Sequence, residues 1–155
     1  MLDDLRELYQ EVILDHGRSP RNFRCPAHPT CRAEGNNPMC GDTLSVFLVV
    51  NDRDVIEDAG FEGKGCAISI ASASLMTEVM KGTTVAQAEH LFDAFHRLCT
   101  IADPDPDVPD GDTDPLERLQ VFSGVRAFPI RVKCATLAWH TMKAALAGEA
   151  EASSE

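Results

Sequence analysis

A thiol and a carboxylate separated by one glycine are the residues with the clearest chemical potential. Cys40 and Asp42 flank Gly41 in the stretch NNPMCGD, which leads directly into the apolar stretch TLSVFLVV. In an extended backbone, side chains at positions i and i+2 project to the same side, so both groups can face one ion. Thiolates and carboxylates are both zinc ligands, and the glycine relieves crowding at the turn. The spacing therefore indicates a candidate metal-binding pair.

Two further cysteines are candidates for the same ion because both are expected near the start of a helix. Cys66 follows the glycine-containing stretch FEGKG, and helix N-terminal N–H groups there favour a thiolate. Cys134 lies in the first turns of the last predicted helix, with Arg131 and Lys133 nearby to lower its pKa. No CxxC pair is present, and free cysteine is also among the most buried residue types. Spacing alone therefore leaves open both a site of three cysteines with Asp42 and separate, buried cysteines.

The sequence favours structural roles over chemical ones for the remaining cysteines and for the acidic stretch. Cys99 lies near the end of an amphipathic segment and is expected in the core. Cys25 and Cys31 bracket the stretch PAHPT, but the spacing of these thiols and His28 matches no zinc pattern. Residues 103–115 (DPDPDVPDGDTDP) predict an exposed, extended loop. A calcium loop is the alternative, although the glycine and glutamate spacing of an EF-hand is absent.

The composition is that of one globular domain with an acidic bias. The chain has 155 residues, 44% of them hydrophobic, and a formal net charge of −11. This charge argues against nucleic-acid binding, which needs clustered Lys and Arg. No stretch approaches the roughly 18 apolar residues of a membrane span, and the acidic, amphipathic start differs from a signal peptide. We therefore expect a cytoplasmic protein whose six cysteines serve metal binding or thiol chemistry.

Hydrophobic periodicity predicts helices packed around a small sheet. Apolar residues at helical spacing predict a first helix over residues 2–16, with His16 favourably placed at the negative end of its dipole. Residues 44–50 and 55–60 predict an antiparallel strand pair, and a short strand is expected near 32–34. Further helices are predicted over 67–81, from a Thr84–Gln87 capping box through Leu98, over 114–122, and from Pro129 onward.

This order of elements predicts an α+β fold, in which helices pack on one face of a small antiparallel β-sheet. We expect a single domain over residues 1–148, with an acidic, Pro-rich insertion loop at about 100–115. Residues 149–155 are expected to form a flexible C-terminal tail.

Three segments of the chain resemble the IscU/SufU family of iron–sulfur cluster assembly proteins. They are NPMCGD, FEGKGCAISIASASLMTE and RVKCATLAWHTM, and they contain Cys40, Cys66 and Cys134. The opening stretch LRELYQEVILDHGRSPRN extends the resemblance over nearly the whole chain. IscU-type proteins carry a histidine immediately before the third cysteine, where this chain has Lys133. The insertion around 100–120 is also typical of the SufU branch, which the chain therefore resembles more closely.

The resemblance implies a zinc site formed by Cys40, Asp42, Cys66 and Cys134. It assigns Cys40 as the acceptor of persulfide sulfur from a SufS-type cysteine desulfurase, a histidine of which replaces Cys40 on the zinc. Asp42 then helps to hold the zinc, and its weak preference for soft metals makes the site labile. The sulfur passes to a downstream SUF scaffold. The implied activity is zinc-dependent sulfur transfer, because a closed four-ligand site leaves no position for an activated water.

Two other functions stay open on the same residues. One is an IscU-like scaffold that assembles a [2Fe–2S] cluster on Cys40, Cys66 and Cys134, with iron in place of zinc. Lys133 argues against it, because a potential fourth ligand is missing. The other is a docking protein for the desulfurase in which zinc is purely structural.

Overall fold

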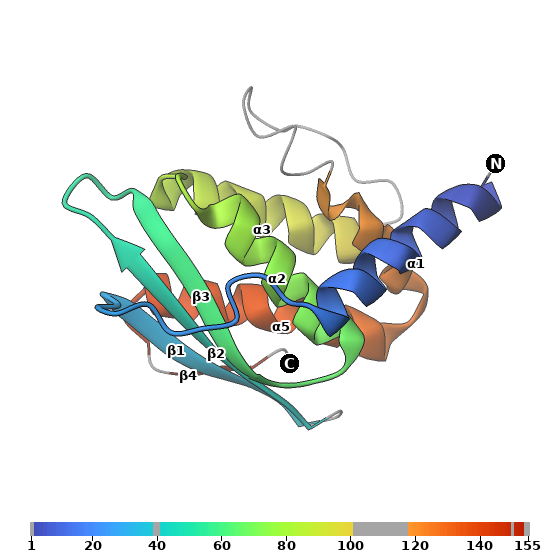
Figure 1. Cartoon of the computed structure of the whole chain (residues 1–155), viewed down its shortest axis with the longest axis horizontal. Helices are drawn as coiled ribbons and strands as arrows, with labels where there is room; N and C mark the ends of the chain where they lie inside the picture. The colour runs from blue at the N-terminus through green and yellow to red at the C-terminus, as the bar shows by residue number, and fades with distance from the viewer. Residues whose placement is uncertain (1, 39–40, 101–117, 150, 154–155) are drawn as a thin grey trace.

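The structure, a computed structural model, describes residues 2–38, 41–100, 118–149 and 151–153. The elements are shown in Figure 1, and all bounds below refer to these residues. In chain order they are α1 (Leu2–Arg18), β1 (Cys31–Asn37), β2 (Asp42–Val50), β3 (Ile56–Lys64), α2 (Ala67–Met80), α3 (Val85–Thr100), the 3-10 helix η1 (Gln120–Ala127), α5 (Pro129–Leu146) and β4 (Glu151–Ser153).

The sheet is built on β2, which pairs antiparallel with β3 on one side and β1 on the other. Val46 lies opposite Ala33 of β1 and Phe61 of β3, and all three side chains are buried. Because alternate residues of a strand share a face, these positions define the core face of the sheet. The predicted α+β fold with an antiparallel sheet is confirmed. β1 is longer than the strand expected near 32–34, since it pairs with β2 along its whole length.

The C-terminal segment differs from the flexible tail that the sequence predicts for residues 149–155. Within the described part of this segment, Glu151–Ser153 forms β4 and pairs in parallel with Glu34–Asn36 of β1. The free backbone groups at the edge of β1 are a ready template for another strand. Gly148 has a φ of +79°, a conformation that favours glycine and turns the chain after α5. The fourth strand makes the sheet mixed.

Two helices cover the core face of the sheet, as predicted. α5 lies against β1 and β2, and α2 lies against β3 (Figure 1). α5 approaches β1 so closely that a Cβ on Gly35 would lie 1.9 Å from the Thr141 hydroxyl. α3 and η1 pack outside α5, where Phe95 stacks on Trp139 at 4.5 Å between ring centroids. Trp139 and Cys99 are fully buried, and the prediction that Cys99 lies in the core is confirmed.

The starts of α3 and α5 follow the sequence signals, whereas α1 continues two residues beyond the predicted end, to Arg18. The Thr84–Gln87 capping box is present: the Thr84 N–H donates to Gln87 Oε1 at 2.9 Å, and the Gln87 N–H donates to Thr84 Oγ1 at 3.1 Å. Pro129 begins α5. The predicted helix over 114–122 falls partly outside the described residues. Within the described residues, the 3-10 helix η1 continues past the predicted end at 122, to Ala127. The acidic loop at about 100–115 lies almost wholly outside them.

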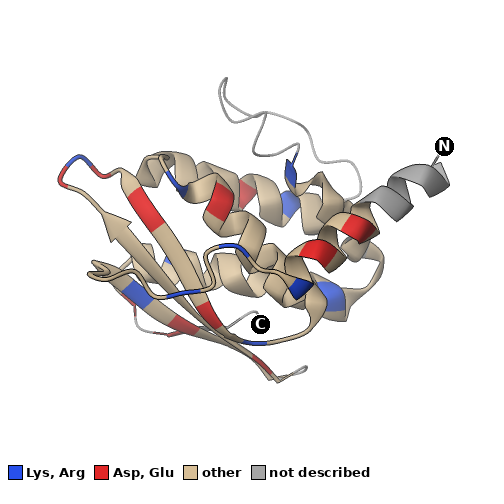
Figure 2. Ribbon diagram, viewed as in Figure 1, with Lys and Arg blue, Asp and Glu red and all other residues tan. Residues whose placement is uncertain are grey.

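Residues of both charges are interspersed along the described ribbon (Figure 2). On the sheet side, Arg24 and Lys81 flank Asp58, with nitrogen–oxygen distances of 3.0 and 3.3 Å. None of the described helices combines the length and apolar character needed to cross a membrane.

Candidate metal centre

Three ligand-type side chains from distant parts of the sequence converge at one end of the sheet. A carboxylate oxygen of Asp42 and the sulfurs of Cys66 and Cys134 all lie within 4.8 Å of one another. Two atoms bound tetrahedrally to one zinc ion are roughly 3.3–3.8 Å apart, given zinc–ligand distances of about 2.0–2.3 Å. Small side-chain movements therefore bring all three atoms into range of one ion. This is the one such group found among the described residues.

Asp42 is held at the inner face of the sheet by strand periodicity. It is the first residue of β2 and pairs with Asn37 at the end of β1. It shares the core face with Leu44 and Val46, so its carboxylate turns inward and is only 3% exposed. Gly41, with a φ of +76°, allows the chain to enter β2 in this direction.

Cys66 is the N-cap residue of α2, as the sequence predicts. Its backbone is extended, and its side chain makes no capping hydrogen bond to the helix backbone. Its N–H donates to Asp42 Oδ1 at 3.0 Å, which joins β2 to the start of α2. Gly63 permits the strand exit, because a Cβ there would lie 2.2 Å from the Thr43 carbonyl oxygen. Cys66 is exposed and forms the solvent side of the site.

Cys134 closes the inner side of the site. It lies on α5 and is 3% exposed, so the close packing of α5 on the sheet determines where its sulfur lies. The side-chain amide of Asn37, which is fully buried, approaches this sulfur at 3.8 Å between Nδ2 and Sγ. Such N–H groups stabilise a thiolate by donating toward it.

Sequence reasoning missed Ser69 and Asn37. The Ser69 hydroxyl donates to Asp42 Oδ2 at 2.6 Å and lies 3.2 Å from the backbone oxygen of Cys134. The available signal for Ser69 was its position on the helical face of Cys66, three residues further along α2. The signal for Asn37 was weaker. Its place beside the site follows only from the pairing register of β1 and β2, which sets Asn37 opposite Asp42.

The remaining cysteines differ in their surroundings. Cys40, the predicted fourth ligand and sulfur acceptor, lies outside the described residues. Cys99 is buried in the core, whereas Cys25 is exposed and Cys31 is partly exposed. Neither Cys25 nor Cys31 belongs to the group of three potential metal ligands found among the described residues.

The donor set suits a thiophilic ion. Two sulfurs and one carboxylate oxygen are ligands typical of zinc, and sulfur-rich sites also bind iron. Burial of Asp42 and Cys134 protects one side from water, while exposure of Cys66 leaves the other side accessible. The residues present therefore fit a metal ion that a partner protein can approach.

Comparison with known proteins identifies the family of the chain. Residues 8–110 match the family model described as the NifU-like N terminal domain. The zinc-dependent sulfurtransferase SufU of Bacillus subtilis (strain 168) is 38% identical over 146 residues, covering 94% of each chain. The iron–sulfur cluster assembly scaffold protein IscU of Streptococcus pyogenes serotype M1 is 35% identical, covering 97% of this chain and 90% of that protein.

A solved structure shows the same fold. It is that of a candidate iron–sulfur cluster assembly scaffold protein for the SUF system, from Fervidobacterium islandicum AW-1. The identity is 31%, the TM-score is 0.75, and the match covers 88% of this chain and 94% of that one. The resemblance seen in the cysteine segments is thus confirmed, and the chain belongs to the family of NifU-like N-terminal domains.

Proposed function

We propose that this protein is a sulfurtransferase that accepts persulfide sulfur from a SufS-type cysteine desulfurase for iron–sulfur cluster assembly. The observation that carries the proposal is the convergence of Asp42, Cys66 and Cys134 within 4.8 Å, from three distant segments. Cys40, the proposed acceptor, is two residues from Asp42 in the sequence. The Bacillus subtilis relative, named a zinc-dependent sulfurtransferase, supports the same activity.

Four residues would hold a zinc ion in this proposal: Cys40, Asp42, Cys66 and Cys134. When bound, zinc keeps the cysteines deprotonated and links segments that are distant in the sequence. One group of the chain supports the same charge state. The Asn37 side-chain amide approaches the Cys134 sulfur at 3.8 Å and favours its thiolate.

The transfer step is an ordinary thiol–persulfide exchange. The Cys40 thiolate attacks the outer sulfur of the desulfurase persulfide and forms a new sulfur–sulfur bond. The sulfur–sulfur bond of the donor breaks, and the desulfurase cysteine leaves as a thiolate. No oxidant or reductant is consumed, because one sulfur simply moves between two cysteines. The persulfide on Cys40 then passes its sulfur to a downstream SUF scaffold.

The chemistry requires free thiols and therefore a reducing compartment, which we propose is the cytoplasm. Exposure of Cys66, against burial of Asp42 and Cys134, supports approach of the desulfurase from the α2 N-terminus. Asp42 and Cys134 then stay shielded by the sheet and α5 while the exchange takes place.

A scaffold for a [2Fe–2S] cluster on Cys40, Cys66 and Cys134 is the second candidate. It is favoured by the Streptococcus pyogenes relative, which is named a scaffold protein. Lys133, which directly precedes the third cysteine, counts against it because lysine does not supply the imidazole ligand seen there in IscU-type proteins.

The test is mass spectrometry of the intact protein after anaerobic incubation with desulfurase and cysteine. We expect the wild type to gain the mass of one sulfur atom, and Cys40→Ser to gain none. Cys25→Ser is the matched control, since it removes an exposed thiol elsewhere on the molecule and should still be labelled. If Cys40→Ser binds zinc and fully stimulates the desulfurase, sulfur acceptance by Cys40 is wrong. A scaffold would instead gain stable visible absorption with bound iron and sulfide on anaerobic reconstitution.

A further inference from the structure

One buried hydroxyl contacts all three described residues of the candidate metal centre. Ser69 Oγ lies 2.6 Å from Asp42 Oδ2 and 3.8 Å from Cys66 Sγ. It also lies 3.2 Å from the backbone oxygen of Cys134. Ser69 is fully buried, and its three neighbours come from β2, the start of α2 and α5. A single side chain thus links the elements that bring the ligands together.

The single hydroxyl proton of Ser69 goes to Asp42. The 2.6 Å distance is typical of an O–H donor bonded to a charged carboxylate, whereas the bond to the Cys134 carbonyl would be longer. The Cys66 N–H donates to the other oxygen, Oδ1, at 3.0 Å. Both carboxylate oxygens therefore have a donor of fixed position, and the plane of the carboxylate is held.

The surrounding backbone leaves room for this contact. A Cβ on Gly65 would lie 3.0 Å from the Cβ of Ser69 and 3.1 Å from Asp42 Oδ1. Both distances are tighter than ordinary van der Waals contact, so a larger residue at position 65 would push Ser69 and Asp42 apart. The glycine thus makes the close approach of the hydroxyl and the carboxylate possible.

We propose that Ser69 is the positioning residue for Asp42, and that its hydroxyl maintains the metal affinity of the site. This inference rests on the proposed function only in taking Asp42 as a metal ligand. A metal-bound carboxylate that is hydrogen-bonded by a neighbour keeps its orientation, and loss of such neighbours typically costs about 10–100-fold in metal affinity.

Ser72 supplies a matched control on the same helix. It is also fully buried, and its hydroxyl donates to the backbone oxygen of Ala135 at 2.5 Å. It accepts a hydrogen bond from Trp139 Nε1 at 3.1 Å. Ser72 therefore joins α2 to α5 as Ser69 does, but through core residues rather than through Asp42.

The experiment measures zinc affinity by competition with a chromophoric chelator in the absence of desulfurase. We expect Ser69→Ala to lower the affinity by about 10–100-fold, and Ser72→Ala to leave it unchanged while lowering the melting temperature of the metal-free protein. Cobalt substitution gives a second readout, because its visible bands report coordination geometry; these bands should change in Ser69→Ala alone. Equal affinities for the wild type and Ser69→Ala, or equal losses in both variants, would overturn the proposal.

Two further variants separate positioning from folding. Ser69→Thr retains the hydroxyl and should restore most of the affinity; a loss as large as that of Ser69→Ala would show that the hydroxyl is not responsible. In an Asp42→Ala background, Ser69→Ala should cause no further loss, because its effect acts through the carboxylate. Sulfur acceptance is measured separately, by the mass of Cys40. The proposed function can therefore fail while the role of Ser69 stands, and the reverse also holds.

Discussion

The two halves of α2 carry similar polar networks that serve different purposes. Near its start, Ser69 connects Asp42 to the candidate metal centre. Further along, Ser74 Oγ lies 2.7 Å from His16 Nδ1 of α1, and it accepts the Arg21 N–H at 2.8 Å. Each network uses a buried serine of α2 to capture a polar group from a segment distant in the sequence. We call them the metal-site network and the α1 network.

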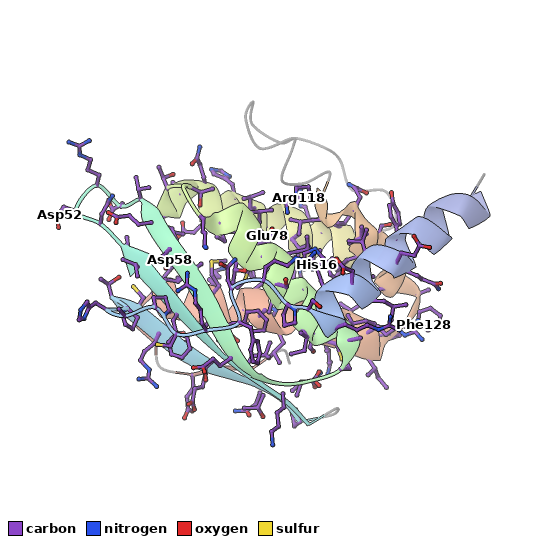
Figure 3. All side chains as sticks on the ribbon, in the orientation of Figure 1. His16, Asp52, Asp58, Glu78, Arg118 and Phe128 are labelled. Carbon is purple, nitrogen blue, oxygen red and sulfur yellow. The ribbon has the colours of Figure 1, made fainter. Side chains whose placement is uncertain are left out.

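The α1 network corrects the expectation that His16 simply caps the first helix. His16 does lie in the last turn of α1, but it is only 7% exposed. Its Nε2 faces Glu78 at 3.8 Å, and Glu78 pairs with Arg118 at 3.0 Å. Figure 3 shows His16 reaching from α1 toward Glu78 on α2, with Arg118 nearby. Packing of α1 on α2 buries the imidazole, which a helix-dipole argument alone does not anticipate.

The difference between the networks lies in their ligands and their access to solvent. The metal-site network includes two thiols and opens to solvent at Cys66. The α1 network has an imidazole as its central group and is closed by the packing of two helices. A buried, satisfied polar network specifies how elements pack, whereas an accessible one with soft ligands can exchange them. The same type of hydroxyl contact therefore stabilises structure in the second half of α2 and supports chemistry in the first half.

Metal removal should give the largest effect and should act through the metal-site network alone. A ligand present at 1,000 times its dissociation constant stabilises the folded state by about 4 kcal/mol. For a domain of this size, that corresponds to a fall of roughly 8–16 °C in melting temperature after chelation. Differential scanning calorimetry before and after verified removal of zinc measures it. An unchanged melting curve would contradict a metal that ties the three segments together.

Replacement of Ser74 should give an intermediate effect confined to the α1 network. Ser74→Ala leaves His16 Nδ1 and the Arg21 N–H without their buried partner, at a cost of about 1–3 kcal/mol in the free energy of unfolding. Urea denaturation of the metal-free protein measures the loss. Zinc affinity should equal that of the wild type, and a parallel fall in affinity would show that the two networks are coupled.

Acidification should give the smallest effect. Burial, together with the nearby Arg21, lowers the pKa of His16 below its ordinary value of 6.5, although Glu78 and Asp15 oppose the shift. The unfolded chain therefore takes up a proton before the folded protein does, and stability falls as pH drops below about 6.5. The loss of stability is absent above the pKa that His16 has in the unfolded chain. It stops growing once the pH is below the pKa that His16 has in the folded protein.

Burial, with His96 and Lys143 nearby, also lowers the pKa of His140, so its contribution has the same sign. The unfolding free energy of metal-free His16→Asn and His140→Asn should each depend less on pH between 5 and 7 than that of the wild type. Arg24→Ala is the control, because this exposed partner of Asp58 lies outside the α1 network and contributes less than about 1 kcal/mol. If both histidine variants keep the full wild-type slope, neither imidazole is the titrating group.

The sequence by itself determined the local structure and the chemistry of the candidate ligands. Alternating apolar residues predicted the strand over 44–50, and the glycine-containing stretch before Cys66 predicted its place at a helix start. The Thr84–Gln87 capping box was predictable too, because it depends on residues three positions apart. Such features follow from backbone geometry over a few residues, and neighbouring residue types are enough to specify them.

Only the tertiary structure decided which distant groups meet. Cys134 reaches Asp42 because α5 packs against β1 at Gly35, a contact between segments about a hundred residues apart. The burial of His16 beside Ser74 and the pairing of β4 with β1 have the same origin. Packing of whole helices and strands sets these contacts, through the combined fit of many apolar side chains. Spacing in the chain therefore suggested the ligands of the candidate site, and the packed core brought three of them together.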